Sequence, residues 1–98
     1  MMWGVSDHPL TLELGSIVAT PGALRALEAA GESPDEFLAR HMAGDWGEVG
    51  EADRDENDLS LREGFRILSA YTLRTGVKIW IITEADRSAT TLLLPEEY

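Results

Sequence analysis

The segment from residue 83 to residue 91 holds the most suggestive cluster of reactive side chains in this chain. It reads TEADRSATT, which places two acids, one arginine and several hydroxyl groups around one predicted turn. An arginine can stabilise the charge of a phosphorane, and a histidine or tyrosine can move protons, so such a set could cleave a phosphodiester. That hypothesis needs one sheet face to gather Arg87, Thr90, Thr91, Tyr71, Tyr98 and His41.

A turn that satisfies its own hydrogen bonds explains the same residues without any reaction. In that interpretation Asp86 accepts from nearby amides, Arg87 pairs with Glu84 or Asp86, and the threonines suit a strand. Small ribonuclease toxins resemble the reactive alternative, but proteins that bind RNA carry clustered cations. This chain has 18 acids against 8 lysines and arginines, for a net charge of −10. The sequence therefore favours a non-enzymatic protein and argues against nucleic-acid binding.

No cofactor or metal centre is expected from the motifs. The chain has no cysteine, which excludes disulfides and thiolate chemistry. Asp53, Asp55 and Asn57 have the spacing that opens a calcium loop, but Asp58 and Gly64 occupy the positions that require glycine and glutamate. The two histidines lack the spacing of metal ligands.

Residues 45–63 concentrate the negative charge, with eight acids and two arginines. The simplest interpretation is a solvated acidic helix. The functional alternative is a surface for a basic protein partner, or a DNA mimic whose carboxylates stand in for phosphates. The candidate interaction residues are Asp45, Trp46, Glu51, Asp53, Asp55, Asp58, Glu84, Asp86 and Arg87. Trp46 has a second interpretation as a plug of the core whose indole N–H donates to a carbonyl.

The secondary-structure elements that must position these groups have their clearest sequence signals in residues 65–94. Three apolar runs, separated by turn signals at residues 74–76 and 85–88, predict an antiparallel meander. The middle run is apolar on both faces, so it should be a central strand covered on both sides. The alternating pattern LTLEL of residues 10–14 predicts a fourth strand.

Three helices are expected before the meander. Residues 20–21 and 33–36 carry helix-start signals, and glycines at 31 and 44 supply the stops. His41 lies on the apolar face of the second helix and should be partly buried. Residues 48–63 predict a third helix with a thin apolar stripe at Val49, Ala52, Leu59 and Leu61. The result is an α+β fold, with two or three N-terminal helices on a three- to four-stranded antiparallel sheet.

The 98 residues fit a single domain, with residues 1–9 as a loosely ordered start. No secretory signal is evident at the N-terminus, and no apolar run approaches the roughly 20 residues of a membrane span. We therefore expect a cytoplasmic protein with no membrane contact. A structural homodimer formed through an exposed strand edge is a further alternative.

Four segments together resemble a family of small bacterial proteins labelled as plasmid-related or mobile-element proteins. They are IVATPGAL (17–24), SPDEFLARHMAGDWGE (33–48), LREGFRILSAY (61–71) and IWIITEADRSATTLLLPEEY (79–98). Some members are named after a type I restriction subunit. The resemblance implies a bacterial cytoplasm and an accessory or defence setting, and it transfers no residue roles. A chain of 98 residues without a cofactor motif cannot house a complete methyltransferase fold.

Overall fold

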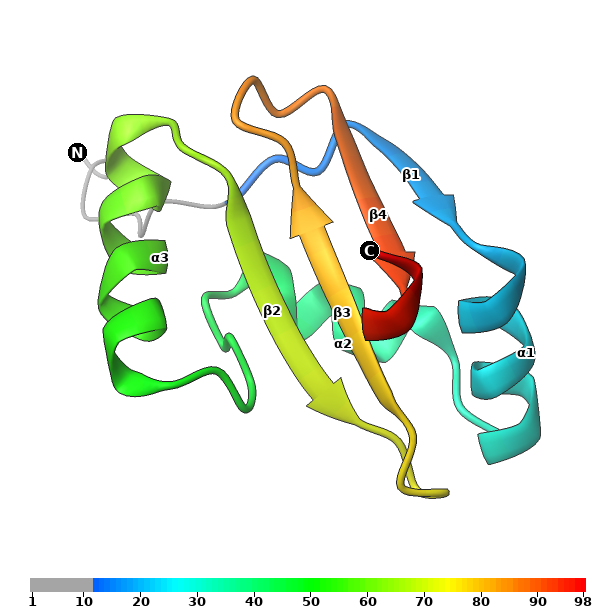
Figure 1. Cartoon of the computed structure of the whole chain (residues 1–98). Helices are drawn as coiled ribbons and strands as arrows, with labels where there is room; N and C mark the ends of the chain where they lie inside the picture. The colour runs from blue at the N-terminus through cyan, green and yellow to red at the C-terminus, as the bar shows by residue number, and fades with distance from the viewer. Residues whose placement is uncertain (1–11) are drawn as a thin grey trace, which may run out of the picture.

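Four strands form one sheet in the order β1-β4-β3-β2, as Figure 1 shows. Their bounds are Ser16–Ala19 (β1), Ile67–Thr72 (β2), Lys78–Thr83 (β3) and Ala89–Leu93 (β4). This computed structural model describes residues 12–98, so the loose start expected at residues 1–9 lies outside the described residues. Three helices pack against the sheet, which confirms the predicted α+β class.

The last three strands form the predicted antiparallel meander. β2 pairs with β3 and β3 pairs with β4, with Ile81 opposite both Ser69 and Leu92. Successive residues of a strand point to opposite faces, which produces the alternating burial of β2. β3 is an interior strand, as predicted. Its Ile79 is fully buried on one face, and Ile82 is only 5% exposed on the other.

The fourth strand differs from the prediction in both place and direction. It is β1, at residues 16–19, and it runs parallel to β4. Residues 12–14, the described part of the predicted strand, belong to no strand. Apolar and polar residues alternate here because Leu12 and Leu14 are buried in the core, although their backbone does not pair with a strand. Gly15, at a φ of +64°, follows them so close to the β3–β4 turn that a Cβ would lie 2.4 Å from the Ser88 carbonyl oxygen. The sheet is therefore mixed rather than antiparallel throughout.

The helices are α1 (Pro21–Ala30), α2 (Pro34–Met42) and α3 (Glu51–Glu63). The hydroxyls of Thr20 and Ser33 accept backbone N–H bonds at the starts of α1 and α2, so both predicted starts are capped. α3 begins later than predicted because residues 46–48 pair with the edge of β2 instead. Gly47 permits this approach, since a Cβ there would lie 2.0 Å from the Ala70 carbonyl oxygen.

The core lies on one face of the sheet. α2 crosses behind that face, and α1 and α3 lie at the two sides of the sheet (Figure 1). Phe37 of α2 meets Tyr71 of β2 with ring centroids 5.4 Å apart. On the opposite face lie the short turn η1 (Pro95–Glu97) and Tyr98, whose ring centroid is 5.6 Å from that of Trp80.

The predicted apolar stripe of α3 is right only in part: Val49 and Leu61 are partly buried and pack against the core, whereas Ala52 and Leu59 are exposed. Leu59 is 44% exposed, and the buried residues of α3 are Asn57 and Ser60. Polar residues lie inside because α3 docks along the edge of the sheet, where free backbone groups require hydrogen-bond partners.

Candidate functional site

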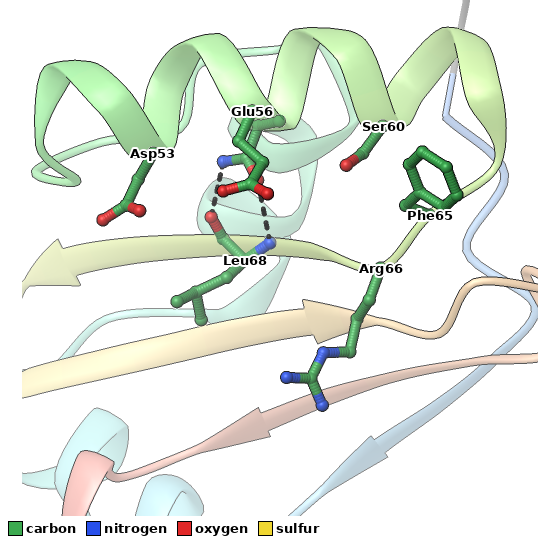
Figure 2. Close-up of a pocket in the computed structure, with 7 residues that line it drawn as sticks. Asp53, Glu56, Ser60, Phe65, Arg66 and Leu68 are labelled. Carbon is green, nitrogen blue, oxygen red and sulfur yellow. Dashed lines mark hydrogen bonds between the residues drawn. The ribbon is translucent and has the colours of Figure 1, made fainter.

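A shallow pocket lies where α3 meets the first residues of β2 (Figure 2). It encloses about 360 Å³ and is lined by Asp53, Glu56, Asn57, Ser60, Phe65, Arg66 and Leu68. In Figure 2 the side chains of Asp53 and Glu56 extend from α3 on the side that faces β2, and the ring of Phe65 stands beyond Ser60. Phe65 is 55% exposed, so its ring is available to a ligand.

The carboxylates of this pocket form no ion pair among the described residues. Asp53 and Glu56 are exposed, and neither forms an ion pair within residues 12–98. The ion pairs of that range lie elsewhere, between Arg40 and Asp45 and between Arg74 and Glu32. The pocket therefore presents a negative wall beside an exposed aromatic ring.

Arg66 lines the pocket but is drawn away from its carboxylates. Its Nη2 donates to the Tyr98 hydroxyl oxygen at 2.7 Å, and its guanidinium carbon lies 5.5 Å from the centroid of the same ring. Figure 2 shows the Arg66 side chain running away from α3. Because Tyr98 also contacts Trp80, Arg66 holds Tyr98 on the open face of the sheet and leaves the negative wall unneutralised.

A single side-chain amide fixes the position of α3 against β2. Nδ2 of Asn57 donates to the Leu68 carbonyl at 2.7 Å, and the Leu68 N–H donates to Oδ1 of Asn57 at 3.3 Å (dashed in Figure 2). This pair of bonds imitates a neighbouring strand. Two residues further along β2, Ala70 exchanges backbone hydrogen bonds with Trp46 and Glu48. The outward backbone groups of Leu68 and Ala70 are thus all paired, and these bonds hold α3 and residues 46–48 against the edge of β2.

Trp46 is a core residue and not a surface anchor. It is 1% exposed, which confirms the interpretation as a core plug. Its indole N–H donates to the Asp58 carboxylate at 2.9 Å rather than to a carbonyl, so that part of the expectation is wrong. Asp58 is thereby engaged within the protein. Asp45 accepts from Nε of Arg40 at 2.7 Å, and this hydrogen bond lowers the pKa of Asp45.

Arg87 cross-links the β3–β4 turn to the end of α3. It donates to the backbone carbonyls of Phe65 (2.7 Å), Ser60 (2.9 Å) and Glu84 (3.2 Å). The predicted pairing of Arg87 with the carboxylate of Glu84 or Asp86 is therefore wrong, because the planar guanidinium instead spreads its donors over several carbonyls. Asp86 accepts from the Ser88 N–H at 3.0 Å, as predicted, and hydrogen bonding to Ser88 lowers the pKa of Asp86.

The remaining interaction candidates lie on two separate surfaces. Glu51 and Asp55 are exposed on α3, outside the lining of the pocket. Glu84 and Asp86 are exposed at the β3–β4 turn, where they line a second shallow hollow. Sequence reasoning missed Glu56 and Phe65. Glu56 belonged to the acidic run, but an apolar residue at the start of a strand gave no signal that its ring would be exposed.

A chain of hydrogen bonds crosses the core between α2 and the sheet. His41, Ser69, Thr83 and Thr90 are all fully buried. Nδ1 of His41 lies 2.5 Å from Oγ of Ser69, and Nε2 lies 2.9 Å from Oγ1 of Thr83. Oγ1 of Thr83 is 2.8 Å from Oγ1 of Thr90, which donates to the Leu14 carbonyl at 2.7 Å.

The Leu14 carbonyl fixes the direction of this chain, because a carbonyl oxygen can only accept. Thr90 donates to it, so the Thr83 hydroxyl donates to Thr90. Thr83 must then accept from Nε2–H of His41. Burial, together with the charge of Arg87, lowers the pKa of His41 to about 4, so the ring is neutral at pH 7. In that neutral form Nδ1 accepts from the Ser69 hydroxyl.

These contacts separate the side chains that phosphodiester cleavage would require. His41 and Thr90 are buried and engaged in hydrogen bonds within the core, and Tyr71 is 1% exposed. Arg87 is held by carbonyls, while Tyr98 lies on the opposite face of the sheet, as does Thr91, which alternates with Thr90. The described residues therefore give no support to a ribonuclease site.

No protein-family model, curated protein or solved structure matches this chain. Within residues 12–98, no helix has the length and apolar composition needed to cross a membrane. The same range contains no group of three or more acids and histidines that could hold a metal ion. The case for a function therefore depends on the chemistry of the pocket itself.

Proposed function

We propose that this protein is a non-enzymatic interaction protein that binds a basic protein partner at the pocket between α3 and β2. A lysine or arginine side chain of the partner would enter between the carboxylates and the exposed ring. The observation that carries the proposal is that Asp53, Glu56 and Phe65 line one pocket, and that neither carboxylate has an ion pair among the described residues. A cation there would pair with the carboxylates and stand against the ring face.

The rest of α3 supports the same choice of partner. Its six acids are all exposed, and they are Glu51, Asp53, Asp55, Glu56, Asp58 and Glu63. Only two arginines lie on the helix. Such a field speeds the approach of a positively charged partner and repels nucleic acid. The resemblance to mobile-element proteins supports a bacterial, cytoplasmic setting for this association.

The proposal is tested with a short lysine-rich peptide as the probe, by calorimetry and by amide chemical shifts. We expect shifts centred on Ser60, Phe65 and Leu68. Asp53→Asn combined with Glu56→Gln should weaken binding by roughly tenfold, because two charge-assisted contacts are lost. The matched control, Glu51→Gln with Asp55→Asn, removes the same charge from α3 outside the pocket and should cost much less.

Phe65→Ala separates pocket recognition from general attraction to the helix. It should weaken binding by a few-fold, since the cation–π contribution at an exposed site is about 0.5–1 kcal/mol. Equal losses from the two charge-removing variants, with Phe65→Ala unchanged, would instead assign binding to the helix charge as a whole. That pattern is the one expected of a DNA mimic. Binding that ignores all three variants would overturn the proposal.

A further inference from the structure

The two edges of the sheet differ in how far other parts of the chain cover them. The edge strand β2 is covered by α3 and by the backbone of residues 46–48. At the other end of the sheet lies β1, which within residues 12–98 pairs with β4 alone. Figure 1 shows β1 at the outer border of the sheet, with α1 following it.

Among residues 12–98, nothing pairs with the backbone hydrogen-bonding groups on the outer side of β1. The N–H groups of Ser16 and Thr20 donate inward to β4, to the Ser88 and Leu92 carbonyls. In a strand, consecutive residues direct their backbone groups to opposite sides. Ile17 and Ala19 therefore direct their N–H and C=O groups outward, on either side of Val18.

The side chains of the edge itself are apolar or uncharged, and a carboxylate, that of Glu97, adjoins its end, where it accepts from the Thr20 hydroxyl at 2.6 Å. Ile17 is 54% exposed, Val18 is 49% exposed, and Leu24 at the start of α1 is 50% exposed. Residues 14–24 contain no charged side chain, although 27% of the whole chain is charged. Natural edge strands are usually protected by charge, proline or a bulge. β1 has none of these within its four residues, and its shortness is the protection that it does have.

We propose that β1 pairs with β1 of a second copy of this chain, antiparallel about a two-fold axis at Val18. Ile17 would then face Ala19 of the second copy, and Val18 would face its own counterpart. The outward groups of Ile17 and Ala19 exchange four hydrogen bonds in this register, and the two sheets join into one of eight strands. A second copy fits this edge because, about an axis at Val18, each outward N–H of Ile17 and Ala19 meets an outward C=O of the other copy.

The distribution of charge favours contact between two copies at this same edge. Two copies that each carry −10 repel one another over most of their surface. Contact is least opposed where charge is sparse, and the uncharged run of residues 14–24 contains the edge, with the Glu97 carboxylate at its Thr20 end. A four-residue strand buries much less than the roughly 1,600 Å² of a standard interface, so a weak, concentration-dependent dimer is expected.

Disulfide trapping tests the register directly. The chain has no cysteine, so Val18→Cys introduces a single thiol. Residues of a non-hydrogen-bonded antiparallel pair have Cα atoms about 4.5 Å apart, which a disulfide can bridge. We expect Val18→Cys to form a covalent dimer under mild oxidation at least tenfold faster than Leu59→Cys. Leu59 is a matched control because it is 44% exposed on α3.

The wild-type chain and a charged variant complete the test. In sedimentation equilibrium, the wild type should be a monomer at micromolar and a dimer at millimolar concentration. Val18→Lys, which sets two ammonium groups against each other at the axis, should abolish the dimer, whereas Leu59→Lys should not. A wild type that stays monomeric at millimolar concentration, or equal oxidation of the two cysteine variants, would overturn the proposal.

Discussion

His41 couples the stability of this fold to pH. The unfolded chain takes up its proton near the ordinary pKa of 6.5, but the folded protein does so only near 4. The contribution of the neutral histidine is therefore complete above pH 6.5 and is lost as the pH falls toward 4. We expect the free energy of unfolding to drop by roughly 2 kcal/mol between about pH 7 and pH 5. Urea unfolding at the two pH values measures the change.

The control for this prediction removes titration but keeps a hydrogen-bonding side chain. His41→Gln should lower stability at pH 7 by about 1–3 kcal/mol, because the chain from Ser69 to Leu14 is broken. It should also flatten the dependence on pH. The chain has one other histidine, His8, which lies outside the described residues. A slope that survives in His41→Gln would show that other groups titrate in this range.

At the scale of elements, the docking of α3 on β2 depends on the two bonds between Asn57 and Leu68. Asn57→Ala leaves a backbone donor and acceptor unpaired, at a cost of about 2–3 kcal/mol. Asn57→Asp should cost a similar amount despite its nearly identical shape. A carboxylate can accept from the Leu68 N–H, but it cannot donate to the Leu68 carbonyl. Thermal unfolding of both variants checks the prediction.

The neighbouring Asp55 supplies the control for α3. It is exposed on the same helix, and Asp55→Ala should change the free energy of unfolding by no more than about 0.5 kcal/mol. If Asn57→Asp were as stable as the wild type, the imitation of a strand by Asn57 would be wrong.

The elements that were predicted well are those whose signals lie within their own stretch of the sequence. β3 and β4 follow from apolar runs bounded by Gly76 and Pro95, and α1 and α2 follow from their capping residues. The parallel pairing of β1 was missed because it joins residues 16–19 to residues 89–92, and no local pattern encodes that contact. Leu12 and Leu14 misled the prediction, since alternation reports burial and not ladder bonding.

The candidate site was harder to predict for a related reason. The acidic run pointed to α3, but the pocket exists only because two polar residues, Asn57 and Ser60, turn inward. A pattern of hydrophobic residues cannot reveal that a polar residue is buried. Likewise Arg87 and His41 have the composition of a catalytic set, and only long-range register shows that hydrogen bonds within the fold engage both.

At the scale of the whole molecule, charge acts in opposite directions on the two proposed contacts. The chain carries 18 acids against 8 lysines and arginines. A basic partner is attracted by this field, while a second copy is repelled by it. The Debye length falls from about 30 Å at 10 mM salt to about 8 Å at 150 mM, so salt weakens both effects.

Added salt should therefore loosen one complex and tighten the other. Between about 10 and 300 mM sodium chloride, we expect affinity for the lysine-rich peptide to fall by an order of magnitude or more, because attraction is screened. Self-association of the wild type should strengthen over the same range, because repulsion between two copies is screened while the apolar strand contact is not. Titration calorimetry and sedimentation on one preparation measure both trends. A dimer that dissociates as salt rises would mean that charged groups hold it together, and would place its interface away from β1.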